Sequence, residues 1–320
     1  MFKWNRVLVA LIGVPLLLFI YAGESFFRIN LYGLPMLIFT NLVISMGTYE
    51  FYKMVKISGK EVYDKFGIIV AIIIPNLVYL SNQSHYSYLE QELIAVVLIV
   101  ATIFMLTYRV FRNQIKGTLE KVSFTLLGIV YVSVFFSQII NLYFLGMIFP
   151  LILQVLVWVS DTSAGIVGVA IGRKFFKNGF TEISPKKSVE GALGSIIFTG
   201  LAFVLIVVLY IERINGTTIG EIFLSFITGA IISVVAQIGD LIESLFKREC
   251  GVKDSGTILM GHGGILDRFD SMILVLPFVL GPSEAGSGNT AVKNCNGTIC
   301  FPSNSIGSIE VIPTFSSTFK

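Results

Sequence analysis

The sequence predicts an all-α, polytopic transmembrane protein with about nine spans and a cytoplasmic N-terminus. Three observations lead to this fold class: the composition, the recurrence of long apolar runs and the distribution of basic residues. Hydrophobic residues make up 54% of the 320 residues and charged residues only 13%, and the mean hydropathy is +0.83. Because a soluble domain usually carries about a quarter charged residues, this chain needs lipid as part of its solvent.

The apolar runs are long enough to cross about 30 Å of hydrocarbon as helices. We expect spans at roughly 7–23, 31–49, 66–80, 93–108, 122–141, 144–171, 191–211, 219–246 and 266–281. Helices are expected because a helix pairs its own backbone groups in lipid, and runs such as 71–74 do not alternate as barrel strands do. Pro277 interrupts the last run, which is short for a full crossing. Lys3 and Arg6 before the first run also suit a cleaved export signal, but the many later spans favour a retained helix.

Basic residues sort to one side of this arrangement. With nine spans, all but four of the 23 Lys and Arg residues fall in the N-terminal segment and in alternate loops that share its side. The four exceptions are Arg28, Arg213, Lys293 and Lys320. The positive-inside rule then places the N-terminus and these loops in the cytoplasm, as in a multi-pass protein of the cell inner (plasma) membrane. The net charge of +3 is too small to indicate nucleic acid as a partner.

Composition also divides the chain into three parts. Residues 1–121 are N-terminal membrane helices, and residues 122–281 form a second membrane region with cytoplasmic loops at 172–191 and 247–268, which holds the candidate catalytic residues described below. Residues 282–320 form a polar tail rich in Gly, Ser, Thr and Asn, which we expect to be disordered or non-native. The three cysteines, Cys250, Cys295 and Cys300, include no CxxC pair, which argues against a zinc site.

Acidic residues stand at the ends of several predicted spans. They are Asp161, Asp240, Glu243, Asp267 and Asp270. Asp240 and Glu243 share one helix face because they lie three residues apart. Carboxylates at such depth are costly and indicate a functional site by default, and gathered together they suit Mg²⁺, which takes oxygen ligands. The alternative is ordinary pairing between helices, for instance Asp267 with Lys247.

A glycine-rich, basic loop joins the last two predicted spans. Five glycines fall between Gly251 and Gly264, and they let backbone N–H groups approach an anion closely. Basic side chains surround them, and His262 between two glycines is a candidate donor to a phosphate. The loop does not contain a Walker A motif. Taken alone, its composition is equally typical of a flexible cytoplasmic loop whose basic residues follow the positive-inside rule. Beside the acids, it favours phosphoryl or nucleotidyl transfer.

The residues in this region resemble the signature of the phosphatidate cytidylyltransferases. The match comprises SLFKR at 244–248, KDSG at 253–256 and HGGILDRFD at 262–270. ISPKKSVEG at 183–191 resembles a second family segment, and the GD at 239–240 and WVSDTSA around Asp161 also fit. Met260 departs from the family, which usually has proline, glycine or serine there. This departure concerns the turn of the loop rather than its charged residues.

The resemblance implies a nucleotidyltransferase of phospholipid biosynthesis. The phosphate of phosphatidic acid would attack the α-phosphorus of CTP, giving CDP-diacylglycerol and pyrophosphate. It implies CTP, phosphatidic acid and membrane lipid as partners, a homodimer, and Mg²⁺ as cofactor, with a second, monovalent cation such as K⁺ left open. The residues implied as catalytic are Asp240, Asp267, Lys247, Arg248 and His262. Those implied to bind substrate are Lys187, Ser188, Lys253, Asp254, Gly263, Gly264 and Arg268. Those implied to hold metal are Asp240, Asp267, Asp161, Glu243 and Asp270.

Other functions stay open on the residues alone. Another CTP-using membrane lipid transferase, such as a polyprenol kinase, would share this chemistry. A transporter would place its charges at mid-membrane and show discontinuous helices, whereas the dense charge here lies in loops. A membrane scaffold without catalysis would not need acids clustered beside glycines.

Overall fold

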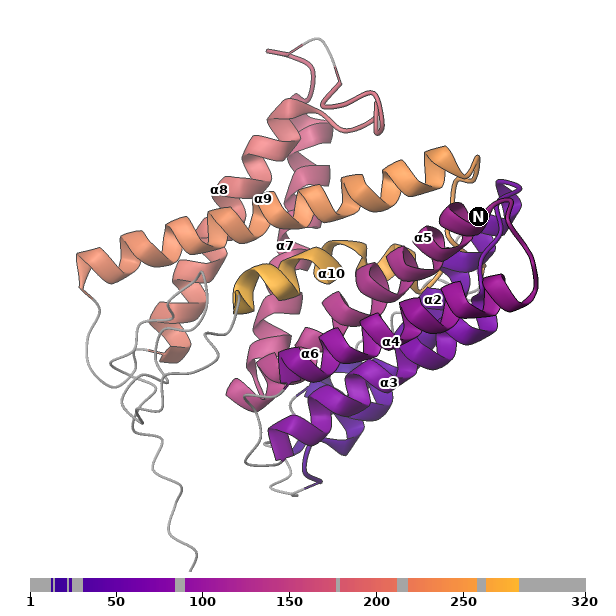
Figure 1. Ribbon diagram of the computed structural model, residues 1–320. Helices are drawn as coiled ribbons and strands as arrows, with labels where there is room; N and C mark the ends of the chain where they lie inside the picture. The colour runs from indigo at the N-terminus through magenta and orange to yellow at the C-terminus, as the bar shows by residue number, and fades with distance from the viewer. Residues whose placement is uncertain are drawn as a thin grey trace, which may run out of the picture.

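The protein is built of helices in the computed structural model (Figure 1). The structure describes residues 13, 15–21, 23–24, 31–83, 90–176, 179–211, 218–257 and 263–281. Within these ranges there is no strand, and the one isolated β-bridge joins Gly179 to Ser188. The helices are α2 (Leu34–Ile57), α3 (Asp64–Gln83), α4 (Glu90–Phe111), α5 (Thr118–Gly128), η2 (Ile129–Val134), α6 (Phe135–Leu145), α7 (Phe149–Ile171), α8 (Val189–Ile206), η3 (Val207–Ile211), α9 (Ile219–Glu249) and α10 (Leu266–Leu280).

Six helices of the described chain are long and apolar enough to cross a membrane, rather than the nine that the sequence predicts. They are Asp64–Gln83, Glu90–Phe111, Thr118–Leu145, Phe149–Ile171, Val189–Leu209 and Ile219–Glu249. The predicted span at 7–23 lies mostly outside the described residues. The runs 31–49 and 266–281 form α2 and α10; α2 is long enough but not among the six by composition, and α10 is too short. With 15 residues, α10 is about 22 Å long, less than the hydrocarbon thickness.

Pro277 does not interrupt the last helix as the sequence predicts. It lies inside α10, which continues to Leu280 before Gly281 ends it with a φ of 61°. A proline removes one backbone donor and crowds the preceding turn. The helix therefore lacks the hydrogen bond that the Pro277 nitrogen would donate, but it continues for one more turn, to Leu280.

Apolar side chains cover the outer faces of several helices. On α4 the exposed ones are Val96, Ile99, Val100, Ile103 and Phe104, and on α8 they are Leu193, Ile197, Phe198, Leu201 and Leu205. Spacings of three and four residues place each set on one helix face. Contiguous apolar faces of this size need lipid around them. The chain is therefore a multi-pass membrane protein.

The helices form two groups that α10 joins. Figure 1 shows α2 to α6 as one bundle, α7 and α8 side by side, and the long α9 crossing them. Helix α10 contacts α9, α6, α2 and α7. Helices α8 and α9 approach closely at Gly229. A Cβ added there would lie only 2.7 Å from the Thr199 carbonyl oxygen, so a larger residue would push the helices apart. Small residues at such crossings are common where membrane helices pack together.

The basic loops meet at one end of the protein. Lys60, after α2, pairs with Glu249 at the end of α9 at 2.7 Å, and Lys121 of α5 pairs with Glu61 at 2.9 Å. These ion pairs join the α2–α3 and α4–α5 connections to the last turn of α9. The side of the membrane on which these segments lie stays a prediction.

Candidate active site

The site begins where α10 crosses α9 at Gly239. A Cβ at this position would lie 2.9 Å from the Asp270 carbonyl oxygen and 3.0 Å from the Ser271 Cα. Only a residue without a side chain lets the two backbones approach so closely. Asp240 follows Gly239 directly, so the crossing brings Asp240 and Asp270 to the same place. In the GD pair at 239–240, the glycine thus allows the two helices to cross, and the aspartate contributes its carboxylate to the site.

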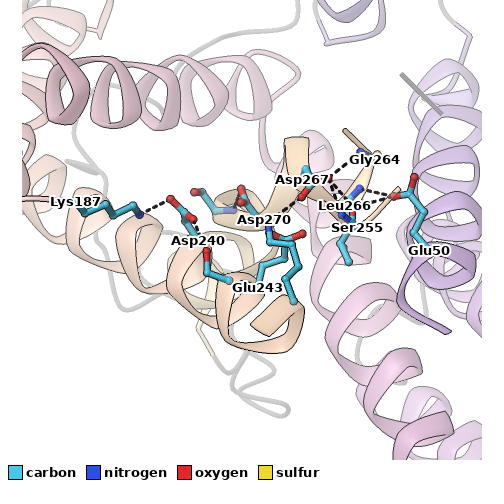
Figure 2. Close-up of polar contacts among 12 residues, drawn as sticks. Glu50, Lys187, Asp240, Glu243, Ser255, Gly264, Leu266, Asp267 and Asp270 are labelled. Atoms are coloured by element: carbon cyan, nitrogen blue, oxygen red, sulfur yellow. Dashed lines mark hydrogen bonds and ion pairs between the residues drawn. The ribbon is translucent and has the colours of Figure 1, made fainter. Parts of the chain in front are cut away.

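All five acids predicted for the site lie close enough for their charges to interact. Asp270 interacts with both Asp240 and Asp161, and Glu243 interacts with Asp270 and Asp267. In Figure 2, Asp270 lies between Asp240 and Asp267. Asp161 comes from α7, is exposed, and makes no hydrogen bond or ion pair with the described residues. Like charges gathered this way repel one another, so the arrangement needs cations to stabilise it.

Lys247 is the cation within the acid cluster. Its ammonium group forms ion pairs with Glu243, one turn earlier on α9, and with Asp267 of α10, the latter at 2.8 Å. The side chain of Glu243 is fully buried, and its Oε1 atom has no hydrogen-bond partner in the described structure. The pairing of Asp267 with Lys247, the plainer of the two sequence interpretations, is therefore present. It occurs inside the acid cluster rather than apart from it.

Lys187 brings the loop at 172–191 into the site. Its ammonium group pairs with Oδ2 of Asp240 (Figure 2). The loop is anchored on both sides of this lysine. Ser188 caps α8, its Oγ accepting from the Gly191 N–H at 3.1 Å, and Glu190 accepts from the Phe175 and Phe176 N–H groups at 2.9 Å each. The hydroxyl predicted to bind substrate thus holds the start of a helix here.

Asp267 folds the glycine-rich loop back onto the start of α10. Its Oδ2 atom accepts from the Ser255 N–H at 3.0 Å, the Ser255 Oγ at 2.9 Å and the Gly264 N–H at 2.8 Å. Gly263 has a φ of 81°, and a Cβ there would lie 2.5 Å from the same oxygen. One carboxylate oxygen therefore organises the loop while the other faces Lys247.

Glu50 of α2 is part of this arrangement, and the sequence interpretation missed it. Its buried carboxylate accepts from the Leu266 N–H at 2.9 Å and from the Ser255 Oγ at 3.4 Å (Figure 2). The available signal was an acid directly after the apolar run 31–49. No spacing rule connects that acid to a loop some 200 residues away.

Tyr131 is a second residue that the sequence interpretation missed. It lies in the π-helical turn η2, is buried, and its hydroxyl has no hydrogen-bond partner among the described residues. Its phenol is near enough to interact with the charges of Glu243, Asp270 and Asp240. Single π-helical turns inside longer helices are frequent at functional sites.

The other predicted residues lie around this cluster or outside the described chain. Arg248, Lys253, Asp254 and Arg268 are exposed. The first three make no ion pair with the described residues, so the structure does not bring them onto the acids. His262 lies outside the described residues, as does Met260. Their place in the site stays a prediction.

The donor set suits a hard cation, although the described residues show no preformed metal cage. No group of three or more His, Cys, Asp and Glu among them is arranged to hold a metal ion. In this arrangement Lys187 pairs with one oxygen of Asp240, and Lys247 pairs with one oxygen of Asp267. The donors are nonetheless all carboxylate oxygens, which Mg²⁺ prefers. The unpartnered Oε1 of buried Glu243 is a further acceptor beside them.

Comparison with known proteins shows which family the chain resembles. The model of the cytidylyltransferase family matches residues 4–281. A phosphatidate cytidylyltransferase of Bacillus subtilis is 33% identical over 246 residues, which are 75% of this chain and 87% of that protein. One of Staphylococcus aureus is 32% identical over 247 residues, 77% and 89% of the two chains. One of Staphylococcus haemolyticus is 37% identical over 182 residues, 57% and 66% of the two chains. The chain therefore belongs to the cytidylyltransferase family.

Proposed function

We propose that this protein transfers CMP from CTP to phosphatidate, forming CDP-diacylglycerol and pyrophosphate. The observation that carries the proposal is the meeting of three separate segments, around Lys187, Asp240 and Asp267, in one cluster of alternating acids and lysines. These are the segments in which the sequence resembles the phosphatidate cytidylyltransferases. The names of the relatives, matched over most of their length, support the same activity.

The reaction needs positive charge more than covalent help from the protein. An oxygen of the phosphatidate phosphate attacks the α-phosphorus of CTP, and the bond to the β-phosphate oxygen breaks, so that pyrophosphate leaves. Mg²⁺, when bound by Asp240 and Asp267 with support from Asp161, Glu243 and Asp270, supplies charge that neutralises the phosphate oxygens.

The two lysines are suited to hold the phosphates. Both are paired with carboxylates of the acid cluster, and about one third of the Lys187 side chain and 13% of the Lys247 side chain are exposed. A phosphate group arriving there gives each ammonium group a second anionic partner, as a point charge without fixed geometry. Lys187 arrives from the α7–α8 loop and Lys247 from α9, so they would approach bound phosphates from two sides.

We further infer that the site faces the cytoplasm of a bacterial inner membrane, where CTP is present. The basic loops that meet at one end of the protein support this orientation through the positive-inside rule. A site at that boundary lets one water-soluble and one lipid substrate reach the same residues. The family resemblance adds a homodimer to the proposal.

Purified protein in lipid or detergent tests the activity directly. It is supplied with phosphatidate, Mg²⁺ and CTP labelled on either the α- or the γ-phosphate. The proposal expects lipid-linked label from α-labelled CTP and labelled pyrophosphate from γ-labelled CTP. Label that moves from the γ-phosphate onto a lipid alcohol would instead identify a lipid kinase.

A further inference from the structure

Glu50 joins the first helix of the described bundle to the glycine-rich loop of the site. Its side chain is buried, with the whole residue 1% exposed. Oε2 accepts from the Leu266 N–H, the first N–H of α10, and from the Ser255 hydroxyl. A carboxylate at a helix N-terminus satisfies a backbone donor that has no partner within the helix. Glu50 therefore caps α10 in place of the helix's own N-cap residue, Ile265, whose side chain makes no capping bond.

Two glycines of the signature are shaped around this carboxylate. A Cβ built on Gly256 would overlap Glu50 Oε1, and one built on Gly264 would overlap both Ser255 Oγ and Glu50 Oε2. Neither glycine has the left-handed backbone that would by itself require glycine, which in the described part of this loop occurs at Gly251 and Gly263. Space for Glu50 is thus the physical reason for a glycine at position 256, and space for Glu50 together with Ser255 is the reason at position 264.

Ser255 couples this contact to the acid that pairs with Lys247. Its hydroxyl lies 2.9 Å from Asp267 Oδ2 and 3.4 Å from Glu50 Oε2. The Gly264 N–H also donates to Asp267 Oδ2. Ser255 therefore connects Glu50 to the Asp267 carboxylate (Figure 2), and the Oδ1 atom of the same carboxylate pairs with Lys247.

We propose that Glu50 is a positioning residue of the active site, which holds the loop at 255–264 and the start of α10 against α2 so that Asp267 keeps its orientation. The importance of this orientation for turnover rests on the proposed function. The contact itself does not, so the two claims can fail separately.

The first experiment compares Glu50→Ala with Glu50→Gln in the full chain. Glu50→Ala leaves the buried Leu266 N–H without an acceptor and removes the longer contact of the Ser255 hydroxyl, whose single proton also faces Asp267 Oδ2. It should lower kcat about 10- to 100-fold, as expected for a buried donor left without a partner. Glu50→Gln should recover part of this loss, because its amide oxygen can accept from the Leu266 N–H. Turnover is expressed per folded protein, measured by size-exclusion chromatography and thermal unfolding. Unchanged kcat per folded molecule in Glu50→Ala would overturn the proposal.

Hydrogen–deuterium exchange gives a readout that needs no activity. In Glu50→Ala, peptides covering Ser255 and Gly264–Leu266 should exchange faster than in the wild type, while peptides from the middle of α9 keep their protection. If these peptides change as expected but the wild type makes no CDP-diacylglycerol, the positioning role stands and the proposed function fails. Unchanged exchange at Leu266 would contradict the positioning role itself.

Glu24 offers a matched control. It is another buried carboxylate, and it accepts from the Gly33 N–H at 2.9 Å and the Leu31 N–H at 3.3 Å, at the opposite end of α2. Glu24→Ala removes the same kind of contact, so it should lower thermal stability without changing kcat per folded protein. An equal loss of kcat in Glu24→Ala and Glu50→Ala would mean that Glu50 acts only through general stability.

A double-mutant cycle tests whether Gly256 is present to accommodate Glu50. Gly256→Ala should reduce kcat strongly in the wild type, because its methyl group meets the carboxylate. In the Glu50→Ala background the same substitution has space, so it should cost less than about twofold further. Additive losses in the double variant would show that Gly256 serves another purpose and would overturn this part of the proposal.

Discussion

At the scale of single residues, Lys247 is the most constrained charge in the site. It is shared by Glu243 and Asp267, whose side chains are 0% and 9% exposed. Lys247→Met would leave two buried carboxylates uncompensated, which costs about 3–5 kcal/mol for a buried pair. We expect a clear fall in the unfolding temperature in detergent and loss of CMP transfer. Lys60→Met is the control, because its pair with Glu249 is much more exposed than those of Lys247 and exposed pairs contribute little. Similar stability losses in both variants would contradict this account.

The second prediction concerns the charges of Asp240 and Asp267. Asp240→Asn and Asp267→Asn keep the side-chain shape but remove the charge that pairs with Lys187 and Lys247. Each should nearly abolish turnover, and Glu61→Gln, which alters an exposed pair with Lys121, should not. The measurement is CMP transfer per folded protein. Normal activity in both aspartate variants would contradict the proposed metal and phosphate site.

Cys250 gives a prediction on pH. The residue is half-buried at the end of α9, and burial raises the pKa of its thiol. Because only the thiolate reacts with alkylating reagents, a raised pKa keeps the group unreactive to a higher pH. With Cys295 and Cys300 replaced by serine, alkylation near neutral pH should be slower than for a free cysteine, and it should accelerate only above pH of about 8.5. Rapid labelling at neutral pH, measured by mass spectrometry, would contradict this prediction.

At the scale of helices, the crossing of α9 and α10 at Gly239 decides whether the acids meet. Gly239→Ala places a methyl group against the Asp270 carbonyl, and such overpacking typically costs about 1–3 kcal/mol. We expect α10 to shift and activity to fall about tenfold or more, since a small misplacement of reacting groups is costly. Gly220→Ala, in the same helix with open space around it, is the control. Full activity of Gly239→Ala would show that the crossing has room to adapt.

Helices were predictable from the sequence to a greater extent than the contacts between them. Apolar runs predict α3, α4, α7, α8 and α9 because each helix satisfies its own backbone bonds. The continuous helix Thr118–Leu145 was predicted only as its middle part. The count of nine spans stays a prediction, because the first run lies mostly outside the described residues and α2 and α10 fall short of the length or hydropathy of the six other helices.

The site was predictable as a set of residues, but its connections were not. Asp240, Asp267 and Lys247 are recognisable by type and position, Lys187 was implied by the family resemblance, and the structure brings the four together. The Glu50–Ser255 contact depends on how α2 packs against the start of α10, and such a tertiary contact leaves no periodic signal in one chain. Ser188 differs in the opposite way. The sequence interpretation predicts that it binds substrate, whereas in the structure it caps helix α8.

At the scale of the whole molecule, the orientation in the membrane can be tested with two positions that one helix separates. Thr118–Leu145 is a continuous helix of 28 residues, about 42 Å long, so its two ends must lie on opposite sides of the hydrocarbon. Ile115 precedes it and Met147 follows it, and both are exposed. With the native cysteines replaced, Ile115→Cys should react with a membrane-impermeant maleimide only in inverted vesicles, and Met147→Cys only in right-side-out vesicles. The reverse pattern would place the basic loops, and with them Lys187 and Asp240, on the outer side, where CTP is not supplied.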